Sequence, residues 1–411
     1  MFDGTAYFDS LNMFGIRLGL DAVRELACRA GEPHTGLRFV HIAGTNGKGS
    51  VGAMLERALR ACGFTTGFYT SPHLIDIRER FRINGKVVDR ALFDSLAEEL
   101  HIQAGGGNYS YFEFATVLAM KIFLHSRCDV VIWETGMGGR LDATNMVTPE
   151  ASIITNIALD HQGHLGDSLA QIAGEKAGII KPHVPLFHGK LPPEAAAVIY
   201  EKAAQLECEV FPPRESVPSA VSGRNCFYYD GREITLGLPG KMQRENFRIV
   251  YEFLNCFAAR WKFDLNTALA GLANVRWPAR FQQTGRLIVD GGHNPDGVAA
   301  LAEAVGELFP QEKFTVVYAA FGDKHAENCL PFLLPFAARF IFTSVGDHGR
   351  EVCAPEELMK LTGNIPAMAE LTPLQAVHEA EKYPERILVS GSLYLAGMVL
   401  EQYARESAFD L

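Results

Sequence analysis

The sequence has few cysteines and no excess of positive charge. Its 8 cysteines are scattered over 411 residues without a C-x-x-C pair, which argues against a zinc site or a disulfide framework and fits a reducing compartment. Asp and Glu number 48 and Lys and Arg 38, so the net charge is −10. A chain this acidic is a poor electrostatic partner for nucleic acid or for an anionic membrane. We therefore expect small-molecule partners instead, bound in a local positive pocket.

Long apolar runs are also lacking. The stretch 387–400 has 14 residues and contains Ser390, Gly391 and Ser392, so it is too short to span a bilayer. The first ten residues show no basic segment followed by an apolar one, which a signal peptide would have. These features predict a cytoplasmic protein.

Strand-like and helix-like segments alternate along most of the chain, which is typical of parallel sheets with crossover helices. The fold class is therefore predicted to be α/β, with one domain over residues 1–283 and a smaller Rossmann-like α/β domain over 284–411. Alternation around Asp230-Gly231 predicts a β-hairpin insertion at 225–238. The expected strands of both domains are 37–43, 66–70, 129–134, 151–157, 287–290, 314–320, 340–344 and 387–390. The expected helices are 48–62, 111–125, 244–262, 265–275, 296–309, 355–362, 373–383 and 392–406.

A glycine-rich turn joins the strand at 37–43 to the helix at 48–62. Glycines let backbone N–H groups approach phosphate oxygens, and the helix N-terminus adds a favourable dipole. Lys48 supplies a positive charge and Ser50 a hydroxyl near any metal. The spacing departs from the strict G-x-x-x-x-G-K-[ST] loop, and the alternative is a β–α turn with an incidental lysine. We predict a P-loop domain that binds phosphate through Thr45, Asn46, Gly47, Lys48, Gly49 and Ser50.

Further motifs follow this loop in a fixed order over nearly the whole chain. They are Tyr69–Leu74, Glu134–Asn145, Leu159–His161, Gly174–Lys181, Trp277–Arg280, Asp290–Pro295 and Gly391–Leu395. Together with the loop, this series resembles the folylpolyglutamate synthase/dihydrofolate synthase family of the Mur ligase superfamily. The resemblance implies an ATP- and Mg²⁺-dependent amide ligase that adds L-glutamate to dihydropteroate, to reduced folates or to both, through an acyl phosphate. It also implies that the phosphates bound by the loop belong to ATP and that the P-loop domain is an ATPase domain.

Glu134 is the strongest metal candidate from the residues alone. It ends the apolar strand 129–134, where open α/β sheets place ligand-binding groups, and magnesium needs few protein oxygens because it keeps waters and phosphates. The alternative is a solvated glutamate at a strand end. The resemblance implies that Ser71 and Glu134 bind one magnesium and that His161 binds a second, although His161 taken alone is more typical of a structural or surface histidine.

Lys176 stands next to Glu175, and charge pattern alone indicates an exposed ion pair between the two. The resemblance implies instead that Lys176 is N6-carboxylated, so that its carbamate turns a cation into a magnesium-binding anion. That reaction needs a neutral amine, which desolvation provides by lowering the pKa of lysine.

Further candidates lie before the predicted domain junction, close to it and in the smaller domain. Arg280 follows the rigid Trp277-Pro278 pair, and its planar guanidinium suits a phosphate. The resemblance assigns Asp290 to the nucleotide, His293 to the catalytic cleft and Asn246 to the base. The alternatives are that Asp290 caps the following helix and that His293 only orders its loop. Together with Lys48 and Lys176, Asp290 and His293 form the predicted catalytic set. The sequence departs from the family pattern at Met242, Ala279, Gln282 and His325, where the family has histidine, glycine, glutamate and aspartate.

Three segments resemble the family's dihydropteroate site. One of them, Leu141-Asp142-Ala143, is similar to the corresponding loop of the family's bifunctional bacterial enzymes. An aromatic-bearing segment with an acid suits a flat, hydrogen-bonding ring, but Tyr111 and Phe112 also fit an ordinary helix core. Two alternatives to a bifunctional monomer are a synthase acting on folates only and, more distantly, a P-loop regulatory ATPase. The segments are Leu18-Gly19-Leu20, Ser110-Tyr111-Phe112-Glu113 and Leu141-Asp142-Ala143.

Overall fold

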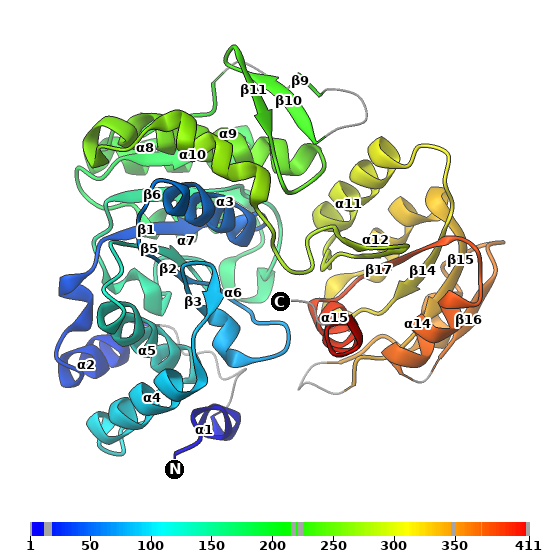
Figure 1. The fold of residues 1–411 in the computed structure, drawn as a ribbon, viewed down its shortest axis with the longest axis horizontal. Coiled ribbons are helices and arrows are strands. Elements are labelled where there is room, and N and C mark those ends of the chain that lie inside the picture. Colours follow the sequence, from blue (N-terminus) through cyan, green and yellow to red (C-terminus); the bar gives the residue numbers. More distant parts are fainter. Residues whose placement is uncertain are drawn as a thin grey trace. The chain divides into compact units, whose positions relative to one another are not determined.

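The computed structural model describes residues 2–11, 19–214, 219–220, 225–346, 351–370 and 372–407. The chain forms two units, each described by itself below. The first comprises Met1–Ala220, Cys226–Leu236 and Glu245–Val275, and the second comprises Val221–Asn225, Gly237–Arg244 and Arg276–Leu411. Each contains a largely parallel sheet with helices (Figure 1), which confirms the predicted α/β class. The domain boundary at residue 284 stays a prediction.

An eight-stranded sheet forms the centre of the first unit. Its strand order is β4-β3-β2-β5-β1-β6-β7-β8, and only β3 and β4 run antiparallel to their neighbours. Strands buried on both faces form nearly continuous apolar runs, which is why β1, β2, β5 and β6 could be predicted. The other strands are only two or three residues long and give no periodicity. The strands are β1 (Phe39–Ala43), β2 (Thr66–Tyr69), β3 (Phe81–Ile83), β4 (Lys86–Val87), β5 (Val130–Glu134), β6 (Ala151–Ile154), β7 (Leu186–His188) and β8 (Val210–Phe211).

Helices cover both faces of this sheet. On one face α3 (Lys48–Ala61) packs on the strands and against α10 (Leu265–Gly271), and on the other lie α2 (Asp21–Arg29), α4 (Arg90–Ala104) and α5 (Tyr111–His125) (Figure 1). Helix α5 has the predicted bounds and is buried along almost its whole length. The remaining helices that carry or flank site residues are α1 (Gly4–Ser10), η3 (Ala143–Met146), α6 (Gln162–Leu165), α7 (Leu169–Lys176), α8 (Pro193–Gln205) and α9 (Lys241–Trp261).

The predicted β-hairpin is confirmed. Strands β10 (Cys226–Tyr229) and β11 (Arg232–Thr235) pair antiparallel, and β9 (Ser219–Ala220) adds a third strand. Asp230 (φ 50°) and Gly231 (φ 72°) both adopt the left-handed conformation. A two-residue turn of this kind matches the twist of the flanking strands, and Asp-Gly is one of its preferred sequences.

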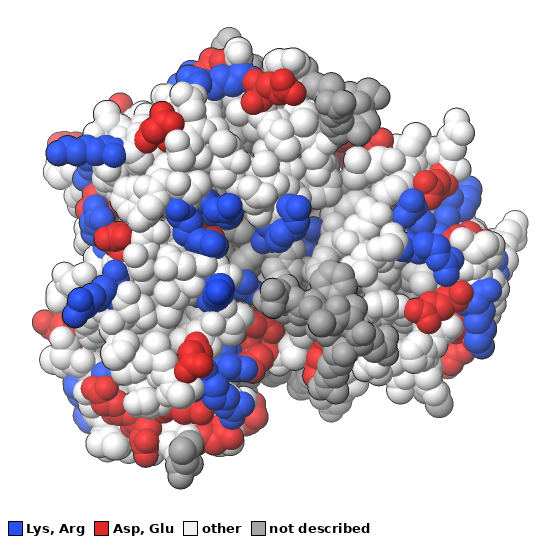
Figure 2. Space-filling view, in the orientation of Figure 1, with Lys and Arg blue, Asp and Glu red and all other residues white. Residues whose placement is uncertain are grey.

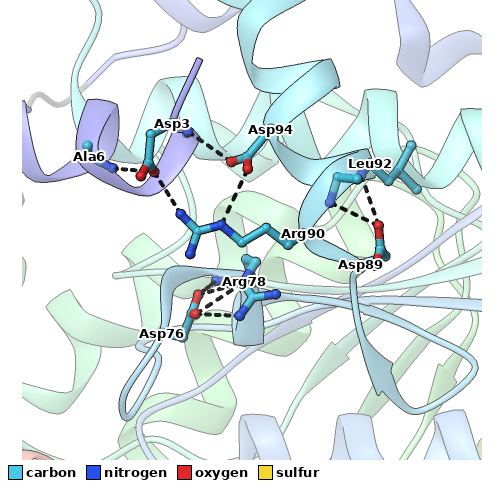
Figure 3. Close-up of polar contacts among 10 residues, drawn as sticks. Asp3, Ala6, Asp76, Arg78, Asp89, Arg90, Leu92 and Asp94 are labelled. Carbon is cyan, nitrogen blue, oxygen red and sulfur yellow. Dashed lines mark hydrogen bonds and ion pairs between the residues drawn. The ribbon is translucent and has the colours of Figure 1, made fainter. Parts of the chain in front are cut away.

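Polar contacts attach helix α1 to helix α4 in the first unit (Figure 3). The Arg90 guanidinium donates to Asp3 Oδ1 (2.9 Å) and to Asp94 Oδ2 (3.3 Å), and the Gly4 N–H donates to Asp94 Oδ1 (2.9 Å). The Asp3 side chain also caps α1 through the Ala6 N–H. Asp94 therefore accepts hydrogen bonds from both the arginine and the backbone of α1.

We expect Asp94→Ala to destabilise this attachment more than Arg90→Ala. Both partners of the Arg90–Asp3 pair are about half exposed, and such pairs contribute at most about 1 kcal/mol. Removing the Asp94 carboxylate leaves the buried Gly4 N–H without its acceptor, which costs about 1–3 kcal/mol. Urea unfolding of both variants, with hydrogen exchange of the α1 amides, measures the difference. Equal losses in the two variants would contradict this ranking.

A six-stranded sheet forms the second unit, in the order β12-β13-β17-β14-β15-β16. Only the edge strand β12 is antiparallel. The strands predicted at 287–290, 314–320, 340–344 and 387–390 are confirmed, although β15 begins three residues earlier than expected. The elements are β12 (Gln282–Thr284), β13 (Leu287–Val289), α11 (Pro295–Leu308), β14 (Phe314–Tyr318), α12 (Ala326–Leu333), β15 (Ala337–Phe342), α13 (Pro355–Met359), β16 (Ala367–Ala369), α14 (Pro373–Glu381), β17 (Arg386–Ser390) and α15 (Leu393–Ser407).

The surface carries charges of both signs. On the face shown in Figure 2, acidic side chains gather over the part of the first unit that contains α1 and α4, and Lys and Arg are interspersed elsewhere. Among the residues that the structure describes, none of the helices combines the length and apolar character needed to cross a bilayer.

Candidate active site

The phosphate loop lies between β1 and α3 at the carboxyl edge of the first sheet. Its backbone is fixed by the segment after β6: the Thr45 N–H donates to the Asn156 carbonyl (3.1 Å) and the Asn46 N–H to Asn156 Oδ1 (2.8 Å). Lys48 Nζ donates back to the Gly44 carbonyl (3.0 Å). The N–H groups of the first helical turn have no intrahelical acceptor. The loop therefore offers donors and a positive charge in one place, as an anion site requires.

Two glycines are needed where the loop meets its neighbours. A Cβ on Gly44 would lie 1.8 Å from Thr155 Oγ1, and one on Gly47 (φ 86°) would lie 2.6 Å from Asn246 Oδ1. The buried Asn246 side chain of α9 therefore lies directly against the phosphate loop.

Glu134 ends β5 beside the end of β2, because Tyr69 and Trp133 are register partners on these parallel strands. Its side chain is only 3% exposed, and the Thr70 hydroxyl donates to Glu134 Oε2. The alternative of a solvated strand-end glutamate is therefore wrong. Ser71 directly follows Thr70, so the two predicted metal ligands Ser71 and Glu134 come from adjacent strand ends. Thr70 was not predicted from the sequence as a site residue.

Lys176 is the last residue of α7 and is 3% exposed. Desolvation by burial and, to a smaller extent, the nearby Lys48 charge lower the pKa of its amine to about 7, against the opposing charges of Asp160 and Asp142. The Glu175 carboxylate pairs with Arg140 instead (2.8 Å). The alternative of an exposed Glu175–Lys176 pair is wrong, because α7 turns Lys176 into the interior and Glu175 toward Arg140.

His161 precedes α6 in a left-handed conformation (φ 52°), and its N–H donates to Asp160 Oδ1 (2.9 Å). The neighbouring Asp160 is one of the two carboxylates that raise the pKa of Lys176 against the effect of burial. Within the described ranges, no cluster of three or more His, Cys, Asp or Glu side chains could hold a metal.

Two of the predicted acyl-site segments meet in the first unit, since the Gly19 N–H donates to the Leu141 carbonyl (3.4 Å). Leu20 is the N-cap residue of α2, and Leu18 lies outside the described residues. A cavity of about 430 Å³ is lined in part by Gly19 and Glu113 and by Asp21, Glu25 and Tyr109.

The segment at the start of α5 has mainly structural roles. Ser110 and Glu113 form a capping box, in which each side chain accepts from the other's N–H. Tyr111 is buried against Phe8, as its helix-core alternative expected. Phe112 instead reaches the 136–140 loop, where a Cβ on Gly136 would lie 2.6 Å from its ring.

Asp142 is buried and accepts hydrogen bonds at both oxygens. Oδ2 accepts from the Met137 N–H (2.8 Å), and Oδ1 accepts from the Thr144 N–H (3.0 Å) and from the Thr144 hydroxyl. Burial raises the pKa of its carboxyl, and these hydrogen bonds oppose the shift. Asp142 also caps the short helix η3, which begins at Ala143.

In the second unit, Asp290 follows β13 at the carboxyl edge of the sheet. Its oxygens accept from the Phe281 and Gly292 N–H groups (both 2.8 Å). Burial raises the pKa of this carboxyl, and the Arg280 guanidinium opposes the shift. The alternative that Asp290 caps α11 is wrong, because Asn294 does so. His293 Nδ1 lies 3.1 Å from the Gly291 carbonyl, so this histidine does order its loop.

The structure accounts for two of the departures from the family pattern, Ala279 and Gln282. Ala279 adopts φ 53°, a conformation that favours the glycine of the family pattern. Gln282 Oε1 accepts from the Ala279 N–H (3.1 Å), so the amide oxygen supplies an acceptor as a glutamate would. His325 lies at the start of α12, with Nδ1 3.2 Å from Glu327 Oε1. Met242 is in the first turn of α9, and nothing in the structure explains this substitution.

Comparisons with known proteins agree with this geometry. Residues 42–186 match the Mur ligase middle domain, and residues 279–393 match the Mur ligase glutamate ligase domain. A dihydrofolate synthase/folylpolyglutamate synthase of Bacillus subtilis is 32% identical over 429 aligned positions, which cover 95% of this chain and 97% of the relative. The chain belongs to the folylpolyglutamate synthase/dihydrofolate synthase family.

Solved structures extend this likeness over the whole fold. Escherichia coli FolC in complex with DHPP and ADP is 28% identical, has a TM-score of 0.85, and covers 98% of this chain and 97% of its own. A bifunctional synthase of Yersinia pestis with AMPPNP and a Mn ion is 27% identical, with a TM-score of 0.83 and coverages of 97% and 96%. The family member described here is therefore an ATP-dependent ligase, as the sequence predicted.

Proposed function

We propose that this family member joins the amine of L-glutamate to the carboxylate of dihydropteroate and also extends reduced folates. The observation that carries the proposal is in the first unit. There the buried amine of Lys176 is close enough to two groups for both of their charges to change its pKa. The two groups are Lys48 of the phosphate loop and Asp142 of the acyl-site loop. Relatives from Bacillus subtilis and Escherichia coli that are named dihydrofolate synthase/folylpolyglutamate synthase support it.

The reaction has two steps. A carboxylate oxygen of the acyl substrate attacks the γ-phosphorus of ATP, which releases ADP and gives an acyl phosphate. The glutamate amine then attacks the acyl carbon, and the tetrahedral intermediate loses phosphate and a proton to leave the amide. Lys48 offsets the negative charge of the transferring phosphoryl group.

Magnesium fits the residues present. Glu134 is a buried carboxylate already oriented by the Thr70 hydroxyl. Ser71 and Glu134 would hold one magnesium, and His161 would hold a second. Magnesium neutralises phosphate charge when bound. The manganese in the Yersinia pestis relative supports a divalent ion here.

We also propose that Lys176 is N6-carboxylated. Its neutral amine would attack carbon dioxide, form a nitrogen–carbon bond and lose a proton, leaving a carbamate anion. Burial and a pKa of about 7 keep a large share of the amine neutral near physiological pH. A carbamate would also remove the repulsion between two ammonium groups at Lys48 and Lys176.

The proposal gives the second unit the remaining roles. Arg280 and Asp290 would contact the nucleotide, and His293 would act in catalysis. In the first unit, Asn246 would contact the base. The match of residues 279–393 to a glutamate ligase domain supports glutamate recognition there. The enzyme would work as a cytoplasmic monomer.

Phosphate release by the purified protein tests the proposal. With ATP, magnesium and glutamate, we expect release to require an acyl substrate and to occur with both dihydropteroate and tetrahydrofolate. Turnover with tetrahydrofolate alone would reduce the function to that of a folylpolyglutamate synthase. Release with ATP alone would favour a regulatory ATPase.

A further inference from the structure

His41 is a buried histidine close to the proposed acyl site. It lies in β1, is 0% exposed, and its Nε2 is 2.9 Å from the Thr144 Oγ1 atom. Trp133 is its register partner on the neighbouring parallel strand β5, and the indole Nε1 donates to the Thr144 carbonyl (3.0 Å). Two side chains from adjacent strands therefore hold the same threonine.

Thr144 transmits this contact to Asp142. Its N–H and its hydroxyl both donate to Asp142 Oδ1. Three groups of Thr144 therefore already form hydrogen bonds: the carbonyl accepts from Trp133, and the N–H and the hydroxyl donate to Asp142. The hydroxyl oxygen can still accept one hydrogen bond, and His41 Nε2 is in position to donate it.

This arrangement selects one form of the imidazole. Burial and, to a smaller extent, the nearby Lys181 charge lower the pKa of His41 to about 3, so the ring is neutral. A neutral imidazole carries one N–H. Nδ1 has no hydrogen-bond partner among the described residues. With the proton on Nε2, Nδ1 buries only a lone pair, whereas the other tautomer would bury an unpaired N–H.

We infer that His41 is a positioning residue for the acyl substrate. As the Nε2–H tautomer, it directs the Thr144 hydroxyl proton to Asp142 and so orients that carboxylate as an acceptor. An acceptor of this kind suits a ligand ring that presents N–H donors, as the amino-oxo ring of dihydropteroate does. The inference rests on the proposed function, which places Asp142 in the acyl site.

Equilibrium binding of dihydropteroate in the presence of ADP tests the inference. We expect His41→Leu and Thr144→Val each to raise the Kd for dihydropteroate roughly tenfold, since each breaks a hydrogen-bond chain that ends on a charge. His41→Gln keeps an amide N–H near the place of Nε2, so we expect it to restore the Kd to within about threefold. The double variant should lose less than the product of the two single effects, because both act on one chain.

Ser152→Ala is the matched control. Ser152 is the register partner of His41 on β6, is fully buried, and donates to the Ile179 carbonyl (2.9 Å). This variant therefore measures how the loss of a buried hydrogen bond beside β1 affects binding when the hydrogen bonds of Asp142 are left intact. We expect this variant to keep its Kd for dihydropteroate and all variants to keep their Kd for ADP.

The outcomes separate the two proposals. If the wild-type protein does not bind dihydropteroate, the proposed function fails and the inference fails with it. If the wild type binds but His41→Leu has an unchanged Kd, or loses ADP and dihydropteroate affinity equally, only the inference is overturned. A ¹⁵N spectrum showing the proton of His41 on Nδ1 would overturn it as well.

Discussion

Replacing Lys176 by methionine is expected to lower kcat by about 10²–10³-fold, the usual cost of removing one preorganised charge from a site of phosphoryl or acyl transfer. The same change should leave the protein as stable as the wild type or more stable. The reason is that Lys176 is buried, and an apolar side chain of similar length avoids desolvating an amine. Steady-state kinetics with dihydropteroate and urea unfolding of the same samples measure both effects.

Lys121→Met is the control for this experiment. Lys121 on α5 is also buried, but its Nζ pairs with Glu99 (2.8 Å) and bonds Gln103 (3.0 Å). We expect this variant to lose stability and to keep its kcat. A Lys176→Met enzyme with nearly wild-type kcat would contradict the proposed role.

The proposed carbamate also predicts how activity depends on pH and carbon dioxide. Because the pKa of Lys176 is lowered to about 7, the amine is mostly protonated below that pH and mostly neutral above it. Only the neutral amine reacts, so activity should rise with pH through about 7 and bicarbonate should increase it. Enzyme stripped of carbon dioxide at pH 6 should be the least active and should recover on adding bicarbonate at pH 8. Full activity after stripping, with an unmodified intact mass, would contradict the carbamate.

The fold could be predicted where the sequence carries a long or regular pattern. The buried strands β1 and β5, the helix α5 and the Asp230-Gly231 hairpin each have such a pattern and lie where expected. A strand such as β4, with only two residues, forms because it pairs with a neighbouring strand in the sheet. Which strands become neighbours depends on the tertiary structure, and local residue spacing does not encode it.

The site residues also divide into those that a local sequence pattern predicts and those that depend on tertiary structure. Glycines and a lysine between a strand and a helix were enough to locate the phosphate loop. The environment of Lys176 could not be deduced from charge pattern, because its burial depends on how α7 packs. Asn294 was not foreseen as the cap of α11 in place of Asp290. The chain from His41 through Thr144 to Asp142 joins residues about a hundred positions apart, so no motif contains it.

Glu134→Gln is expected to weaken the use of magnesium while leaving the fold intact. Glutamine has nearly the same shape, and its amide oxygen can still accept from the Thr70 hydroxyl, so the free energy of unfolding should change little. The lost negative charge should raise the magnesium concentration for half-maximal activity about 10–100-fold and lower kcat/KM by about 10²-fold at a fixed low concentration. Excess magnesium should restore part of the loss.

Glu56→Gln is the matched control for this prediction, because it changes a second buried Thr–Glu pair in the same unit. Glu56 on α3 accepts from the Thr66 hydroxyl (2.8 Å) and pairs with Arg60 (3.5 Å). Since burial raises the pKa of this carboxyl, neutralising it should be tolerated, and the magnesium titration should match that of the wild type. If Glu134→Gln also titrates like the wild type, Glu134 is not a metal ligand. If both variants shift equally, the effect comes from altered packing of the sheet, because only Glu134 lies at the carboxyl edge beside Ser71.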